Sequence, residues 1–83
     1  MNRQQQFNDL VLRVLHAHGP KSTSDLYRLV QESSPTLCDD REDCTRCKVS
    51  SEPLWKHDMR WAQQMLRAQN KVVLDADRRW RAV

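Results

Sequence analysis

The spacing of apolar residues along the first third of the chain predicts two helices. Residues 5–18 carry apolar side chains at intervals of three and four, which on a helix form one stripe: Phe7, Leu10, Val11, Val14 and Leu15. Gly19-Pro20 ends this helix, because glycine accepts a left-handed cap and proline disfavours helix just before it. Hydroxyls at positions 22–24 then offer an N-cap for a second helix that runs to about Ser33.

The last third predicts a third helix and a hairpin. Residues 54–69 place an apolar stripe on one face, which Trp61 and Met65 widen: Trp55, Met59, Ala62 and Leu66. Residues 71–74 are typical of a short strand, 75–77 of a turn, and 79–83 of a returning strand with Trp80 facing inward. The three tryptophans have the side chains to stack on bases, but their positions in helix and strand favour packing in the core.

This order of elements predicts an α+β fold, mostly α, of the winged helix-turn-helix type. Residues 1–83 form a single domain of three helices plus a short β-hairpin. Residues 35–53 lack helical periodicity and hold all the cysteines, so we interpret them as a Cys-rich insertion loop between the second and third helices. A loop of this length in a small domain is unusual unless something organises it.

The cysteine spacing predicts a zinc site that organises the insertion. The pattern is C-x5-C-x2-C-x9-H, which provides a Cys3His tetrahedral ligand set: Cys38, Cys44, Cys47 and His57. A closed set of four ligands leaves no position for water, so the Zn2+ is expected to be structural, and its binding energy to stabilise the fold.

Other interpretations of the cysteines stay open. Unligated thiols are one, and a redox pair of Cys44 and Cys47 is another, although the acidic loop and the lack of a strand-helix-strand unit disfavour reactive thiolates. The fourth ligand is also open, with alternatives to His57 at Asp39, Asp40, Asp43, His16 and His18.

The formal net charge of +3 is compatible with a nucleic-acid partner, and its distribution adds more. On the third helix, polar residues at intervals of four, three and four share one face over about 16 Å, a length that suits a major groove. This face holds Lys56, Arg60, Gln63 and Arg67, with Gln64 beside it. Arginine and glutamine are side chains that bind guanine and adenine edges bidentately. An ordinary solvated helix face is the alternative.

Two further segments offer groups for phosphate. The predicted hairpin carries Arg78, Arg79 and Arg81, and the start of the second helix, where backbone N–H groups are free, carries Lys21, Ser22 and Thr23. Three separate elements therefore favour nucleic acid as the partner, and duplex DNA in particular. The chain has no signal-peptide core and no apolar run of membrane-spanning length, so we expect a cytoplasmic protein without membrane contact.

Catalysis finds little support in the sequence. With Gly19 as the single glycine there is no phosphate-binding glycine loop, and neither G-x-S-x-G nor H-E-x-x-H occurs. Neither Glu32 nor Glu52 is followed two residues later by the lysine of a restriction-nuclease motif. We therefore expect that the chain is not an enzyme.

The C-terminal half resembles a known family. The string Trp55-x4-Arg60-Trp61-Ala62-x3-Leu66, then Val72-Val73, then Arg79-Trp80, is similar to the winged-helix domain at the N-terminus of Mrr-type restriction endonucleases. The N-terminal half is similar more loosely, over 12–19 and 26–30. The resemblance implies a bacterial-type DNA-binding module without the nuclease domain. Asn70 and Lys71 replace the family's usual glycine near the start of the wing, and the cysteine-rich insertion is not general in the family.

Two functions follow as hypotheses. The first is a DNA-binding module with a structural zinc site that acts as a regulator or as the targeting component of a restriction or mobile-element system. The second is a protein-protein interaction adapter or dimerisation module, in which the partner is a homodimer subunit or another protein. An exposed apolar patch that includes Trp61 and Met65 would favour the second.

Overall fold

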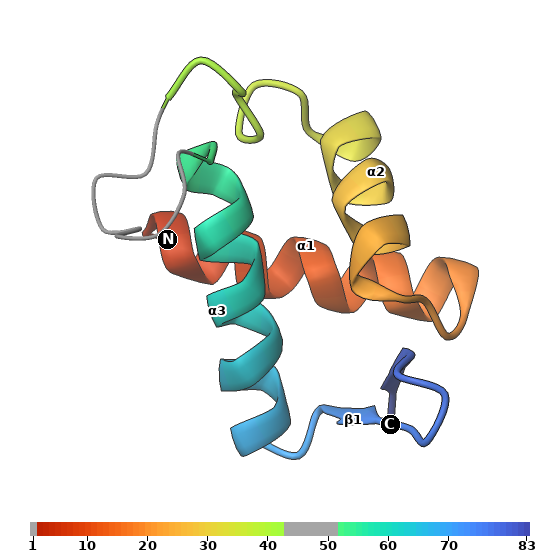
Figure 1. The fold of residues 1–83 in the computed structure, drawn as a ribbon. Helices are drawn as coiled ribbons and strands as arrows, with labels where there is room; N and C mark the ends of the chain where they lie inside the picture. Colours follow the sequence, from red (N-terminus) through yellow and green to blue (C-terminus); the bar gives the residue numbers. More distant parts are fainter. Residues whose placement is uncertain (1, 43–51) are drawn as a thin grey trace.

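The computed structural model describes residues 2–42 and 52–83 and contains three helices followed by a two-stranded hairpin (Figure 1). The helices are α1 (Arg3–His18), α2 (Thr23–Ser33) and α3 (Leu54–Ala68), and the strands are β1 (Val72–Leu74) and β2 (Trp80–Ala82). The predicted α+β class, mostly α, is confirmed, and the arrangement is consistent with a winged-helix-like fold. No helix in the described residues is long and apolar enough to cross a membrane.

Hydrogen bonds from capping side chains determine where α1 begins, and a glycine conformation determines where it ends. The Asn2 side chain accepts a hydrogen bond from the Gln5 amide at 2.8 Å, and the Gln5 side chain accepts one from the Asn2 amide at 3.1 Å. This reciprocal cap starts the helix two residues before the predicted start. At the other end Gly19 has φ 79° and ψ −166°, a backbone conformation essentially restricted to glycine.

The segment between α1 and α2 is tied to the hairpin. Lys21 and Trp80 exchange two backbone hydrogen bonds, at 3.0 and 2.7 Å, and so form an isolated antiparallel bridge. Ser22 then caps α2, because its hydroxyl accepts a hydrogen bond from the Asp25 amide at 3.2 Å. The N-terminus of α2 is therefore held beside β2.

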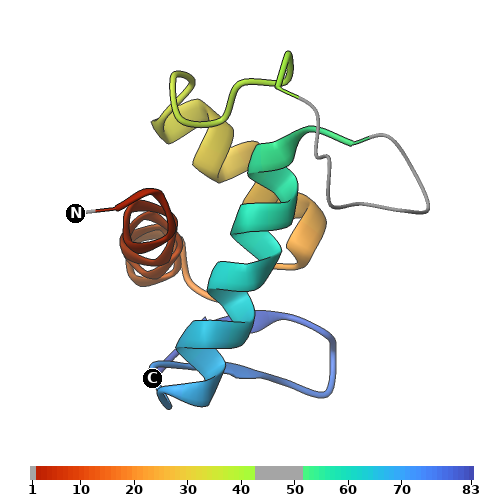
Figure 2. The same cartoon turned by 90° about the vertical axis from the view of Figure 1, so that its left-hand side faces the viewer.

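The core forms where the apolar stripes of the three helices meet the inner face of the hairpin. α1 packs mainly against α3, and Figure 2 shows α1 on one side of α3 and the hairpin loop on the other. Trp55 and Trp80 are buried, as predicted. Trp61 is 55% exposed, so its predicted place in the core is wrong. Successive residues point about 100° apart on a helix, so Trp61 lies beyond the edge of a stripe that runs through Ala62.

The hairpin is short and closes through an aspartate. Val72 pairs with Ala82, Val73 with Arg81, and Leu74 with Trp80. In the turn, the Asp75 side chain accepts hydrogen bonds from the Asp77 and Arg79 amides, at 2.9 and 3.1 Å. An aspartate that bonds to the backbone in this way stabilises a tight turn.

Asn70 explains how the chain leaves α3 without a glycine. Its φ is 60°, in the left-handed region, and it directly follows the C-cap residue Gln69. The Lys71 amide donates to the Leu66 carbonyl at 2.9 Å and the Asn70 amide donates to the Arg67 carbonyl at 3.0 Å. These two bonds form a Schellman motif, in which asparagine is the usual substitute for glycine.

We predict opposite effects of two substitutions at this position. Asn70→Gly is expected to keep or raise the free energy of unfolding, whereas Asn70→Ala is expected to lower it by about 1 kcal/mol, because a β-carbon is strained at positive φ. Urea unfolding measures both, with Gln69→Ala, at an exposed residue of ordinary φ, as the control. Equal stability of the alanine and glycine variants would contradict the assignment.

Candidate nucleic-acid interface

The side of α3 that points away from the core carries most of the predicted groove residues, but not all. Arg60, Gln64 and Arg67 are exposed, and Lys56 is half-buried. Gln63 is only 2% exposed, so its predicted place on this face is corrected. The reason is that α2 packs against the flank of α3 to which Gln63 belongs.

Thr23 is the contact point between these elements. Its hydroxyl oxygen accepts a hydrogen bond from the Gln63 side chain at 3.4 Å and one from the Trp80 indole at 3.1 Å. The hydroxyl therefore joins the first turn of α2 to α3 and β2. Thr23 was predicted as a phosphate ligand, but its side chain is engaged inside the protein. The Ser22 hydroxyl is likewise engaged, as the cap of α2.

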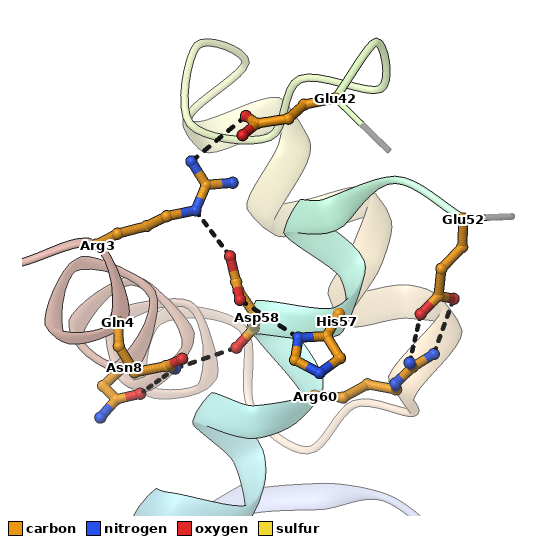
Figure 3. Close-up of polar contacts among 8 residues, drawn as sticks. All are labelled: Arg3, Gln4, Asn8, Glu42, Glu52, His57, Asp58 and Arg60. Atoms are coloured by element: carbon orange, nitrogen blue, oxygen red, sulfur yellow. Dashed lines mark hydrogen bonds and ion pairs between the residues drawn. The ribbon is translucent and has the colours of Figure 1, made fainter. Parts of the chain in front are cut away.

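Arg60 is held by an acidic residue that precedes α3. Its guanidinium forms two parallel hydrogen bonds with the Glu52 carboxylate, from Nη1 at 3.0 Å and from Nη2 (Figure 3). Nη1 also donates to the Tyr27 hydroxyl at 3.4 Å. Hydrogen bonding to Glu52 raises the pKa of Arg60 above its ordinary value. The carboxylate thus occupies one of the bidentate edges through which an arginine binds a phosphate or a guanine.

Lys56 is also engaged within the protein. Its Nζ lies 5.2 Å from the centre of the Tyr27 ring and 5.7 Å from that of Trp55. Both distances fall within the range of cation–π attraction. The N-terminal half of α3 therefore presents two cations whose charges already have intramolecular partners.

The cations of the hairpin and of the C-terminal end of α3 differ from Lys56 and Arg60 in having no such partners among the described residues. Arg67, Arg78, Arg79 and Arg81 are exposed, and none of them makes an ion pair with a carboxylate in the part of the chain that the structure describes. Lys71 shares both properties, although it was not among the predicted nucleic-acid contacts. Its position directly after α3 could have indicated this role. Lys21 is half-buried, and its backbone is bridged to Trp80.

The predicted zinc site is only partly within the described residues. Cys44 and Cys47 lie outside them, as does the alternative ligand Asp43. Among residues 2–42 and 52–83 no three histidine, cysteine or acidic side chains are grouped to hold a metal ion. Cys38 is 1% exposed, and burial raises the pKa of its thiol to about 11, against an opposing effect of Arg3. The Leu54 amide, directly after the insertion, donates a hydrogen bond of 2.6 Å to the carbonyl of Glu42, which lies within it.

Two alternative ligands already have partners. Asp40 accepts hydrogen bonds from the Trp55 indole at 2.7 Å and from the Gln31 side chain at 3.0 Å, and these bonds lower the pKa of Asp40. Both carboxylate oxygens of Asp39 accept from Arg41. His16 and His18 are exposed in the last turn of α1.

His57 lies beside Asp58, an acidic residue that was not among the predicted site residues. Its Nδ1 is 3.4 Å from a carboxylate oxygen of Asp58, and the other oxygen of Asp58 accepts from Arg3 Nε at 2.7 Å (Figure 3). Asp58 is buried, and the Gln4 side chain donates to its backbone carbonyl at 3.1 Å. This cluster fastens the start of α1 to α3. The sequence could have indicated the burial of Asp58, because its helical spacing from Trp55 and Ala62 places it at the edge of the buried stripe.

We predict that the Thr23 hydroxyl stabilises the junction of α2, α3 and β2. Thr23→Val keeps the shape of the side chain but leaves the buried Trp80 indole N–H without its acceptor, which is expected to cost about 1–3 kcal/mol of unfolding free energy. Thermal and urea unfolding measure the loss. Thr23→Ser retains the hydroxyl and is expected to stay close to the wild type, so an equal loss in both variants would contradict this role.

Comparison of the chain with protein-family models, with curated proteins and with solved structures found no match.

Proposed function

We propose that this chain is a DNA-binding module that contacts the backbone of duplex DNA through exposed cations on α3 and the hairpin. The observation that carries the proposal is the set of exposed cations without a carboxylate partner in the described residues, which belong to two neighbouring elements of a winged-helix-like fold: Arg67, Lys71, Arg78, Arg79 and Arg81. Cations of this kind bind phosphate and release counterions.

Gln64 and Arg67 supply the base-reading part of the proposal. Both are exposed on the same side of α3, and their side-chain types bind adenine and guanine edges. The resemblance of residues 55–80 to the winged helix of Mrr-type restriction endonucleases supports a role as a regulator or as the targeting component of a restriction or mobile-element system. We propose no catalytic role for the chain itself.

The exposed Trp61 favours a second candidate function. It is a large apolar side chain in solvent, next to the half-buried Met65 on the flank of α3 that faces α1. Tryptophan is enriched at the centres of protein interfaces. An adapter or dimerisation module would use this flank, which differs from the flank that carries Lys56, Arg60 and Arg67.

The affinity of the chain for duplex DNA is expected to depend on the salt concentration. The chain is expected to bind a short random duplex, with an affinity that falls steeply as salt rises. Arg67→Ala is expected to weaken binding and to make the slope of log K against log salt shallower by about 0.9, the contribution of one phosphate contact. Fluorescence anisotropy measures both quantities.

Arg13→Ala provides the control, because Arg13 is exposed on α1 and pairs with Asp9 at 3.3 Å. It removes the same charge and is expected to change little. A wild-type chain that forms a salt-insensitive dimer by light scattering and has no affinity for duplex would contradict DNA binding and favour the adapter.

We propose separately that a structural Zn2+ organises the insertion, on the support of the cysteine spacing and of the backbone hydrogen bond that joins Glu42 to Leu54. Protein purified without added metal is expected to contain about one zinc per chain, because a Cys3His set is closed. Cys44→Ser is expected to lose the metal.

Two roles are open to the buried Cys38, that of a zinc ligand and that of an apolar residue of the core. Cys38→Val separates them, because valine fills a similar apolar space and has no sulfur. If Cys38 is a zinc ligand, the variant is expected to lose the zinc and to keep its helical circular-dichroism signal. Wild-type protein without zinc in elemental analysis, or Cys38→Val protein that keeps its zinc, would contradict the ligand set.

A further inference from the structure

The cations on the proposed DNA-binding side fall into two groups with different surroundings. Lys56 and Arg60, in the N-terminal half of α3, are engaged with aromatic rings and with Glu52. The second group lies at the opposite end of α3 and on the hairpin, and we refer to it as the wing-end patch: Arg67, Lys71, Arg78, Arg79 and Arg81. Within the described part of the chain, these five have no carboxylate partner.

The exposed cations of the hairpin lie on its outer face or directly before its strands. Val72 and Trp80 are buried and face the core, and side chains alternate along a strand. Arg81 follows Trp80 in β2 and pairs with Val73 of β1, so it points to the outer face. Lys71 directly precedes β1 and Arg79 directly precedes β2, and both side chains are exposed.

The acidic residues of the hairpin do not neutralise this face. Asp75 turns one carboxylate oxygen into the turn, where it accepts from the Asp77 and Arg79 amides. Asp77 is exposed at the tip of the turn. Neither makes an ion pair with Lys71, Arg79 or Arg81 among the described residues. The charge of these three side chains therefore remains available to an external anion.

The hairpin is also fixed in place before any ligand arrives. The Lys21–Trp80 bridge and the bond from the Trp80 indole to Thr23 tie β2 to the start of α2. The Schellman motif at Asn70 connects β1 directly to the end of α3. A face held in this way loses little conformational entropy when it binds.

We infer that the wing-end patch, and not the N-terminal half of α3, makes the main phosphate contacts with duplex DNA. This inference rests on the proposed function and refines it. The physical reason is that Glu52 competes with phosphate for Arg60, and that the aromatic rings already compensate part of the charge of Lys56. The residues of the patch exchange only water and counterions for phosphate.

Three double variants with the same net charge test this inference by anisotropy with a random duplex. Arg79→Ala/Arg81→Ala removes two residues of the patch, and Lys56→Ala/Arg60→Ala removes the two engaged cations. Arg13→Ala/Arg28→Ala is the control, because both arginines are exposed and pair with carboxylates on α1 and α2. The Arg79/Arg81 variant is expected to lose at least about tenfold in affinity at 0.1 M salt, and its salt slope to be shallower by about 1.8.

The Lys56/Arg60 variant is expected to stay within about twofold of the control, which supports the inference. If it loses as much affinity as the Arg79/Arg81 variant, the inference is overturned while DNA binding stands. If the wild type does not bind duplex, or binds only single-stranded RNA, the proposed function itself fails. Circular dichroism checks folding, and Lys56→Ala against Arg81→Ala repeats the comparison if loss of the Glu52 partner unfolds the double variant.

Discussion

The burial of one stripe of α3 against α1 determines what the rest of the molecule can present to a partner. Trp55, Met59, Ala62 and Leu66 are withdrawn from water, and each large apolar side chain contributes about 1.5–3 kcal/mol when buried. Hydrogen bonds and ion pairs at Asp58 and Thr23 then align α1, α2 and β2 around this helix. Only one side of α3 is left in solvent, and the hairpin extends it at one end.

Electrostatic pairing divides that exposed side. A carboxylate that already binds an arginine through two parallel hydrogen bonds competes with any external anion, and Glu52 does this for Arg60. At the other end the acidic side chain of Asp75 is used for the turn. The distribution of charge along the sequence therefore differs from the distribution of charge that is free to bind, and the difference favours the hairpin end.

Periodicity was enough to predict the three helices, the hairpin and most of the core, because each apolar stripe repeats at a helical or strand interval. It misplaced Gln63 and Trp61, because the buried width of α3 depends on how α1, α2 and β1 pack around it, which no local pattern encodes. The Glu52–Arg60 and Arg3–Asp58 pairs join residues whose proximity follows from the fold. The glycine that the resembling family carries near position 70 indicated a left-handed conformation there, and Asn70 adopts one. The cysteine hypothesis stays a prediction, because Cys44 and Cys47 lie outside the described residues.

The proposed surface for duplex DNA runs from the exposed end of α3 onto the hairpin. Backbone amide shifts in an NMR titration with a short random duplex map this surface residue by residue. The perturbed amides are expected to cluster between residues 64 and 81, with those of α1 unchanged. Perturbations concentrated on α1 and around Trp61, or no perturbation at saturating duplex, would contradict it.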